Sequence, residues 1–185
     1  MIAVLRYNEC MTGGQEIEIE RKFLLKKFPD LGGVQLGEVI DTHQVYLKSS
    51  DPNVEVRLRT RTVNGKSTYI LTRKRRISPG VREEHEEELS PEEWRRLYDT
   101  ERDLNSVIID KVRYCLPWKG HMIEIDQYRS PINLSVAEVE LQQLGEHLDL
   151  PPFLEIEREV TNDERYSNAN IAKGSLSAVS PERAI

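Results

Sequence analysis

The chain has 185 residues, a formal net charge of -6 and a pI near 5.4, with 38 % hydrophobic and 31 % charged residues. This length suits one domain with a sizeable core, and the acidic balance argues against a nucleic-acid surface. Cys10 and Cys115 lack the paired spacing of a zinc site or disulfide framework, and no apolar run approaches the roughly 20 residues of a membrane span. We therefore expect one cytoplasmic domain that binds neither nucleic acid nor membrane.

Patterned sequence begins near residue 15. Residues 1–14 show no clear period and are expected to be an N-terminal extension, residues 15–175 form the expected domain, and residues 176–185 a C-terminal tail. Within the domain, period-two alternation recurs in segments bounded by Gly, Pro, Asn and Asp, which is typical of antiparallel strands. The expected strands cover 16–25, 38–48, 54–62, 67–76, 82–89, 106–116, 120–129 and 134–142. Asn64-Gly65 predicts a tight hairpin between two of them.

Helical signals are few and lie between or after the strands. Ser90 is a suitable N-cap, Pro91 suits the first turn, and the helix that they begin is expected to run to about Arg102. A shorter helix is expected at 145–150 and a third after Tyr166, while residues 154–160 are compatible with a strand or with irregular structure. Eight strands with segregated helices predict an α+β fold, namely one eight-stranded antiparallel β-barrel with helices packed outside.

The expected first strand has one charged face. Glu16, Glu18, Glu20 and Lys22 occupy alternate positions, and mostly apolar residues lie between them. For one strand alone, the simplest interpretation is a solvated outer face. Carboxylates two residues apart lie about 7 Å from each other, so they repel by roughly 2.4 kcal/mol at an effective dielectric near 20 and by well under 1 kcal/mol in water. A single charged row is therefore tolerable on a surface and does not by itself indicate a site.

The same alternation recurs along the chain with both signs of charge. Ionic residues alternate in the rows Glu55-Arg57-Arg59-Arg61, Arg82-Glu84-Glu86-Glu88, Lys111-Arg113, Glu124-Asp126 and Glu138-Glu140, and Lys74 follows the neutral Thr72 in the same alternation. Seven of the eight expected strands carry such rows, a regularity that solvated faces would seldom produce by chance. We interpret the charged faces as the lining of a barrel lumen. The apolar faces then point outward and are expected to be covered by helices.

A lumen with both signs of charge predicts a polyanionic ligand that is bound by the basic side chains and by a divalent metal held on the carboxylates. Guanidinium and ammonium groups suit phosphate oxygens, and carboxylates are hard ligands of the kind that Mg²⁺ and Mn²⁺ prefer. The expected phosphate-binding residues are Lys22, Arg57, Arg59, Lys74, Arg82, Lys111 and Arg113. The expected metal ligands are Glu18, Glu20, Glu84, Glu86, Asp126, Glu138 and Glu140, with Glu88 and Glu124 as further acidic residues of the same rows.

The order of these motifs resembles the CYTH domain, also called the triphosphate tunnel metalloenzyme fold, from about Glu16 to Ala172. Its hallmark Glu-x-Glu-x-Lys is found here as Glu18, Glu20 and Lys22. Later matching elements are Gln44-Val45-Tyr46-Leu47, Glu55-Val56-Arg57-Leu58-Arg59, Leu71-Thr72-Arg73-Lys74, the row from Arg82 to Glu88, Lys111-Val112-Arg113-Tyr114, Glu124-Ile125-Asp126 and Ala137-Glu138-Val139-Glu140. The chain departs from the family pattern in the strongly basic run Arg73-Lys74-Arg75-Arg76 and in the charge of Glu87.

The resemblance implies a tunnel in which basic residues hold a triphosphate and carboxylates hold one or two Mg²⁺ or Mn²⁺ ions. The family includes inorganic triphosphatases, thiamine triphosphatases and class IV adenylate cyclases, and this chain looks most like the triphosphatase branch. We therefore expect metal-dependent attack of water on the terminal phosphate of inorganic tripolyphosphate, with Lys22, Glu20 and Arg59 as catalytic residues. Nucleoside triphosphates are possible further substrates. A cyclase that makes cyclic AMP, a non-catalytic polyphosphate- or nucleotide-binding module, and a homodimer remain alternatives.

Overall fold

The computed structural model describes residues 16–78 and 81–176, without the side chains of 16–18. The expected extension at 1–14 lies outside these residues, as does the expected tail beyond Leu176. The strands are β1 (Glu16–Leu25), β2 (Val39–Tyr46), β3 (Val54–Val63), β4 (Lys66–Ser78), β5 (Val81–Glu88), β6 (Ile109–Trp118), β7 (His121–Ser130), β8 (Leu134–Glu140) and β9 (Ile156–Glu159). None of the described helices is long and apolar enough to cross a membrane.

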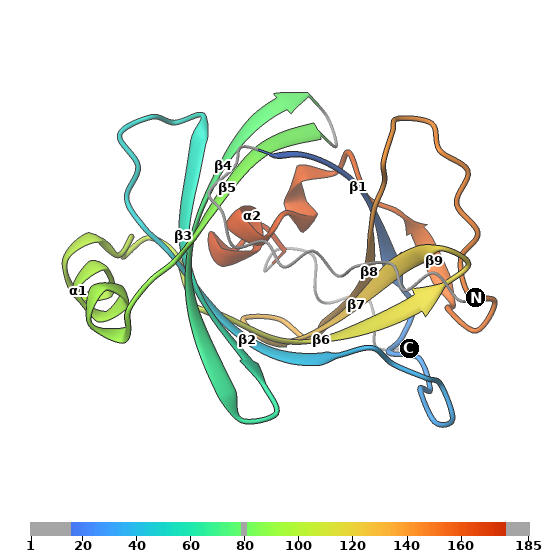
Figure 1. Ribbon diagram of the computed structural model, residues 1–185. Helices are drawn as coiled ribbons and strands as arrows, with labels where there is room; N and C mark the ends of the chain where they lie inside the picture. The colour runs from blue at the N-terminus through green and yellow to red at the C-terminus, as the bar shows by residue number, and fades with distance from the viewer. Residues whose placement is uncertain (1–15, 79–80, 177–185) are drawn as a thin grey trace.

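The first eight strands form a closed antiparallel barrel (Figure 1). Their order is β5-β4-β3-β2-β6-β7-β8-β1, and β1 also pairs with β5, which closes the ring. The expected eight-stranded barrel is thus confirmed. Residues 154–160, which the sequence left open, contain the short strand β9, and it pairs with the end of β1. The predicted hairpin is also confirmed, because Asn64 and Gly65 both have positive φ (50° and 78°), as a two-residue type I′ turn requires.

Helix α1 (Pro91–Glu101) covers one outer side of the barrel (Figure 1). A capping box begins it, because the Ser90 hydroxyl accepts from the Glu93 amide at 3.2 Å while the Ser90 amide donates to the Glu93 carboxylate at 3.3 Å. The apolar stripe of α1 packs on the outer faces of β2, β3 and β4. This outer cluster includes Val45, Leu58, Leu71, Trp94, Leu97 and Tyr98. The position of α1 agrees with the expectation of helices outside the barrel.

Loops, rather than a helix, cover the other apolar side of the wall. The outward residues of β1, β7 and β8 pack against segments 26–38 and 141–155. The helix predicted at 145–150 is wrong, because the structure has only turns and irregular chain there. Gly145 has a φ of 78° and Pro151 follows, so at most five residues between them were available for a helix. Leu148 and Leu150, two residues apart, both pack on the wall, as extended chain allows.

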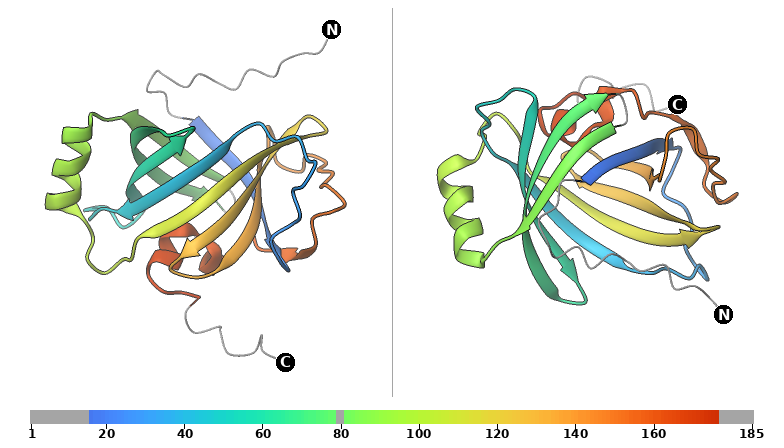
Figure 2. Two further views of the ribbon diagram at one scale, coloured as in Figure 1. Left: turned by 90° about the horizontal axis from the view of Figure 1, so that it is seen from below. Right: turned by 45° about the horizontal axis from the view of Figure 1, so that its top comes forward.

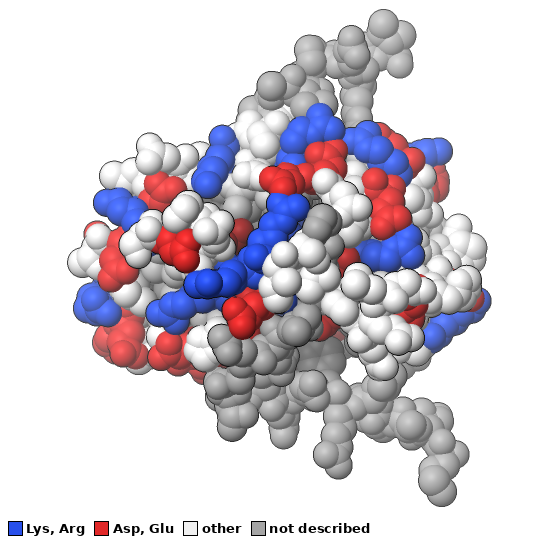
Figure 3. Space-filling model, turned by 90° about the horizontal axis from the view of Figure 1, so that it is seen from above, with Lys and Arg blue, Asp and Glu red and all other residues white. Residues whose placement is uncertain are grey.

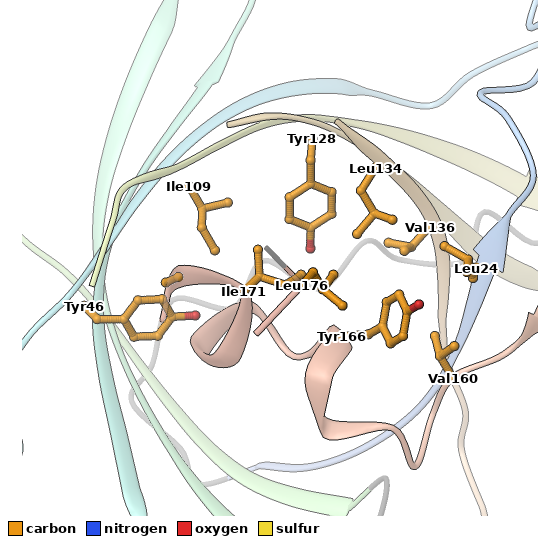
Figure 4. Close-up of a cluster of buried hydrophobic side chains, with 11 residues drawn as sticks. Leu24, Tyr46, Ile109, Tyr128, Leu134, Val136, Val160, Tyr166, Ile171 and Leu176 are labelled. Atoms are coloured by element: carbon orange, nitrogen blue, oxygen red, sulfur yellow. The ribbon is translucent and has the colours of Figure 1, made fainter. Parts of the chain in front are cut away.

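A short 3₁₀ helix and α2 close one end of the barrel. The 3₁₀ helix spans Glu164–Tyr166 and α2 spans Asn168–Ala172, and both lie at one end of the ring of strands (Figures 1 and 2). Their apolar residues meet the last inward residues of the strands (Figure 4). We call this cluster the floor: Leu24, Tyr46, Ile109, Tyr128, Leu134, Val136, Val160, Tyr166, Ile171, Ala172 and Leu176. Unlike α1, α2 therefore shapes the lumen, which is a cup with an apolar bottom.

Candidate active site

The charged rows begin directly above the floor. Strand side chains alternate between the two faces, so a residue two positions from a floor residue also faces the lumen. Moving away from the floor, Leu24 is followed by Lys22 and Glu20 on β1, and Ile109 by Lys111 and Arg113 on β6. The same step leads from Tyr128 to Asp126 and Glu124, from Val136 to Glu138 and Glu140, and from Tyr46 to Gln44. The lumen is therefore apolar at its base and ionic above it.

Six of the charged residues form a deep belt just above the floor. The deep belt consists of Lys22, Arg57, Lys74, Lys111, Asp126 and Glu138, each at most 9 % exposed as a whole residue. Burying an ionised group is costly unless it is paired and hydrogen-bonded. The deep belt contains four of the seven expected phosphate-binding residues, whereas Arg59, Arg82 and Arg113 lie nearer solvent.

On one side of the lumen, three carboxylates converge on Arg113. Its Nε donates to Asp126 Oδ1 at 2.7 Å, its Nη2 donates to Glu138 Oε2 at 2.6 Å, and its Nη1 contacts Glu124. Lys111 contacts Asp126, and Lys22 Nζ lies 2.7 Å from Glu138 Oε1. We call these six residues the Arg113 cluster. It brings together acids and bases from β1, β6, β7 and β8.

The Arg113 cluster shifts pKa values in directions that follow from burial and neighbouring charge. Burial would raise the pKa of Glu138, but Lys22, Lys111 and Arg113 outweigh it and hold that pKa well below its usual range. Burial dominates at Glu124 and raises its pKa. Burial, assisted by Arg113, lowers the pKa of Lys111 to about 8. The cluster therefore holds a carboxylate firmly ionised beside an ammonium group that is easily neutralised.

On the opposite side, β3, β4 and β5 carry a second set of ion pairs. Arg59 Nη2 donates to Glu86 Oε1 at 2.5 Å, and Thr72 Oγ1 donates to the same oxygen at 2.8 Å. Lys74 Nζ lies 2.8 Å from Glu84 Oε2. Burial opposes ionisation of Glu86, but Arg59 and Arg57 outweigh it and lower the pKa of Glu86 to about 2. Arg82 contacts Glu20 and so links this side to β1.

Lys22 is held by the segment that closes the barrel. Its Nζ donates to the carbonyl oxygen of Tyr166 at 3.3 Å, and its backbone amide donates to Thr161 Oγ1 at 3.0 Å. Burial lowers the pKa of Lys22, but Glu138 and Glu20 outweigh this effect and the net pKa is raised. The ammonium group is therefore fixed in place and charged.

The structure brings most of the expected site residues into one lumen. Two expected metal ligands differ from the rest. The backbone of Glu18 lies in β1, but its side chain is outside the described part of the chain. Glu140 faces the same side as Glu138 but is exposed, with Glu20 as its Cα partner on β1.

Several neutral lumen residues were missed by the charge pattern. Gln44 and Thr42 are buried on the inner face, and Tyr46 belongs to the floor. Gln44 Nε2 donates to the Tyr46 hydroxyl at 2.7 Å. A signal was present, because Thr42, Gln44 and Tyr46 alternate along β2 as the charged residues do along its neighbours. Their position became evident only when β2 was paired with β3 and β6.

The outer face of the barrel also carries many charges, but they are arranged differently. Figure 3 shows Lys and Arg interleaved with Asp and Glu over the side formed by β4, β5 and β1. The pairs here are exposed, for example Arg73 with Glu87 at 3.8 Å and Arg75 with Asp51 at 3.4 Å. Such exposed pairs contribute about 0–1 kcal/mol to stability. They do not form an enclosed site.

The chemistry of the lumen carboxylates fits a hard divalent cation. The oxygens that converge in the Arg113 cluster are of the type that Mg²⁺ and Mn²⁺ prefer. These oxygens contact basic side chains, however. Among the described side chains, which exclude those of residues 16–18, no group of three or more His, Cys, Asp or Glu is arranged to hold a metal ion. The residue types thus suit the expected metal, and ligation requires that some ion pairs open.

Comparisons of the sequence and of the structure with known proteins agree on one family. Residues 16–175 match the CYTH domain. The inorganic triphosphatase of Nitrosomonas europaea is 30 % identical over 164 residues, which cover 84 % of this chain and 96 % of that protein. The crystal structure of the inorganic triphosphatase NE1496 is similar with a TM-score of 0.54 at 28 % identity, covering 84 % of this chain and 94 % of its own. Protein PH1819 of Pyrococcus horikoshii OT3 shares the fold at 18 % identity, with a TM-score of 0.55 over 68 % of this chain and 78 % of its own.

Proposed function

The chain belongs to the CYTH domain family, and on that premise we propose that it is a metal-dependent hydrolase of triphosphate compounds, with inorganic tripolyphosphate as its main substrate. The observation that carries the proposal is the deep belt, in which four basic side chains are buried above the floor. Water-excluded cations bind phosphate oxygens more strongly than exposed ones, because the surrounding dielectric is low. The relative of 30 % identity that is an inorganic triphosphatase supports the same substrate class.

In this proposal the basic residues hold the phosphates and orient the terminal one. Arg57 and Arg59 bind from β3, Lys74 and Arg82 from the neighbouring strands, and Lys111 and Arg113 from the opposite side. Lys22 is the β1 member of the Arg113 cluster, and its Nζ lies 2.7 Å from Glu138 Oε1. We propose that its ammonium group stabilises charge on the reacting phosphate. Glu20 and Arg59 complete the catalytic residues that we propose.

Mg²⁺ or Mn²⁺, when bound, supplies positive charge that polarises the phosphate oxygens and favours attack of water on phosphorus. The residues proposed to hold it are Glu18, Glu20, Glu84, Glu86, Asp126, Glu138 and Glu140. An incoming triphosphate offers the basic residues another anionic partner. We therefore expect substrate binding to release carboxylates from their ion pairs, so that metal and substrate bind more tightly together than separately.

A phosphate-release assay tests the proposal. The purified protein is incubated with tripolyphosphate, ATP, GTP or thiamine triphosphate, each with Mg²⁺ or Mn²⁺, and orthophosphate is measured. We expect many turnovers with tripolyphosphate and none when the metal is chelated. Absence of phosphate release from every substrate would contradict a hydrolase.

The same reactions separate the alternative functions. Cyclic AMP and pyrophosphate formed from ATP would identify a cyclase. Tight binding with at most one phosphate released per chain would identify a non-catalytic binding module. Light scattering of the same preparation gives the oligomeric state, on which the proposed hydrolysis does not depend.

A further inference from the structure

Three unpartnered polar atoms lie together on the inner face of β2 and β3. They are Gln44 Oε1, Arg57 Nε and Arg59 Nε, all of them buried, and within the described residues none has a hydrogen-bond partner. Gln44 lies opposite Arg59 in the strand register, and Tyr46 lies opposite Arg57. A buried polar atom without a partner costs about 1–3 kcal/mol, so three at one place are unexpected in a wall that serves only for stability.

The two arginine nitrogens are donors, which indicates an anionic partner. The terminal Nη2 atoms of both guanidinium groups already have acceptors, because Arg59 Nη2 donates to Glu86 and Arg57 Nη2 donates to Glu84. Their Nε–H groups remain. Two N–H groups from adjacent inward residues of one strand suit a phosphate oxygen.

Gln44 completes the set when its amide turns over. At present Nε2 donates to the Tyr46 hydroxyl, which leaves Oε1 without a donor. Because the two ends of an amide have nearly the same shape, rotation by half a turn exchanges them. The Tyr46 hydroxyl then donates to Oε1, and the two hydrogens of Nε2 become available to the lumen. Burial strongly raises the pKa of Tyr46, so the phenol keeps the proton that this arrangement needs.

We propose that Gln44, Arg57 Nε and Arg59 Nε form an oxyanion subsite for the innermost phosphate of a linear oligophosphate, with Tyr46 as the residue that positions Gln44. This subsite deepens the proposed function and rests on it, because it assumes that a triphosphate enters the lumen. Gln44 is fully buried directly above the floor, and apolar floor residues leave it no further polar partner below. The subsite therefore takes a chain end, and the rest of the substrate extends toward the open end of the cup.

Two measurements with tripolyphosphate test the subsite. Titration calorimetry in EDTA gives the Kd without turnover, and steady-state phosphate release in Mg²⁺ gives the KM. We expect Gln44→Met to weaken binding about 10- to 100-fold, the usual range for one hydrogen bond to a charged group. Gln44→Glu keeps the shape and the contact with Tyr46 but replaces the donor by a charge, so it should abolish binding. Gln127→Met on β7, where alternation places the side chain on the outer face with Ile125, is the matched control and should bind as wild type does.

A double-mutant cycle distinguishes positioning from general stability. Tyr46→Phe should weaken binding in the wild-type background and have little further effect in the Gln44→Met background, since the hydroxyl acts through the amide. Additive effects, or unchanged binding by both Gln44 variants with wild-type melting curves, would overturn the subsite. If wild type binds tripolyphosphate without releasing phosphate, only the hydrolase proposal fails. If it does not bind in either buffer, both fail.

Discussion

Lys74 and Arg75 are neighbours on β4, but Lys74 faces the lumen and Arg75 faces solvent. The same division into an enclosed inner face and an exposed outer face applies to the other strands of the barrel. The Lys74 side chain is 10 % exposed and lies 2.8 Å from Glu84 inside the lumen. The Arg75 side chain is 57 % exposed and lies 3.4 Å from Asp51 on the outer face. In the sequence both belong to one basic run, so composition alone does not separate them. Their different roles follow from the alternation of strand side chains between a closed lumen and solvent.

Exposed and buried ion pairs also differ in their contribution to the free energy of unfolding. An exposed ion pair is worth about 0–1 kcal/mol, whereas removing one partner of a buried pair costs about 3–5 kcal/mol. Replacing a whole buried pair by apolar residues of similar volume is often neutral or stabilising. A lumen filled with ion pairs is therefore better explained by ligand binding than by stability.

The largest effect is expected at the centre of the Arg113 cluster. Arg113→Met leaves Glu124, Asp126 and Glu138 close together without the guanidinium that they share, so the free energy of unfolding should fall by about 3–5 kcal/mol. Urea denaturation measures the loss. Mn²⁺ should restore part of it in the variant, because a divalent cation can neutralise the released carboxylates. An unchanged denaturation midpoint would show that the three carboxylates do not depend on Arg113.

Lys22 tests the catalytic side of the lumen. Lys22→Met should lower kcat for tripolyphosphate by about 100- to 1,000-fold, because it removes a fixed positive charge beside the reacting phosphate. Glu20→Ala, which removes a proposed metal ligand, should abolish activity. Circular dichroism should show a folded barrel for both variants. Retained turnover would contradict the proposed role of Lys22, and unfolding would identify a structural residue instead.

Glu86 gives the lumen a defined dependence on pH. Its pKa is lowered from 4.5 to about 2, so the stability that it contributes is present above about pH 4.5 and is lost as the pH falls toward 2. Because its side chain is 34 % exposed, solvent screening reduces the contribution to about 1–2 kcal/mol. The free energy of unfolding, measured by urea denaturation, should therefore fall less between pH 5 and pH 2 in Glu86→Gln than in the wild type. An identical pH profile in the variant would show that Arg59 does not stabilise the ionised carboxylate.

The neighbouring pair on β4 gives the smallest and most closely matched contrast. Lys74→Ala should raise KM for tripolyphosphate about tenfold, the loss of roughly 1.4 kcal/mol of binding. Arg75→Ala, one residue away, should leave KM unchanged and stability within about 0.5 kcal/mol. Steady-state phosphate release at matched Mg²⁺ concentration measures both. Equal effects of the two substitutions would remove the distinction between lumen and outer face.

Much of the barrel was predictable because its pattern is local. The period-two pattern gave all eight strands, and the assignment of Lys22, Lys111 and Arg113 to the lumen followed from the repetition of charged rows on seven of them. A helix after Tyr166 was predicted and α2 is found there, but its position at the end of the barrel was not predictable. The helix α2 has only five residues, too few for a clear amphipathic period, and its place depends on Tyr166 and Ile171 reaching the floor. The helix expected at 145–150 is wrong, because the chain between Gly145 and Pro151 is too short and is irregular there.

Neutral lumen residues mark the limit of the charge pattern. Gln44 carries no charge, and its importance depends on lying opposite Arg59 and beside Tyr46, which only the strand register reveals. The proposed metal ligands have a similar limit. Sequence gave the residue types, but the ion pairs that now hold Asp126 and Glu138 arise from four separate strands.

A crystal structure of the protein with tripolyphosphate and Mg²⁺, collected on the slow Lys22→Met variant, tests most directly whether the lumen is the binding site. We predict one triphosphate inside the barrel, its inner end at Gln44, Arg57 and Arg59 and its other oxygens near Arg113. Triphosphate bound instead to Arg73 and Arg75 on the outer face, with the lumen ion pairs unchanged, would contradict the account.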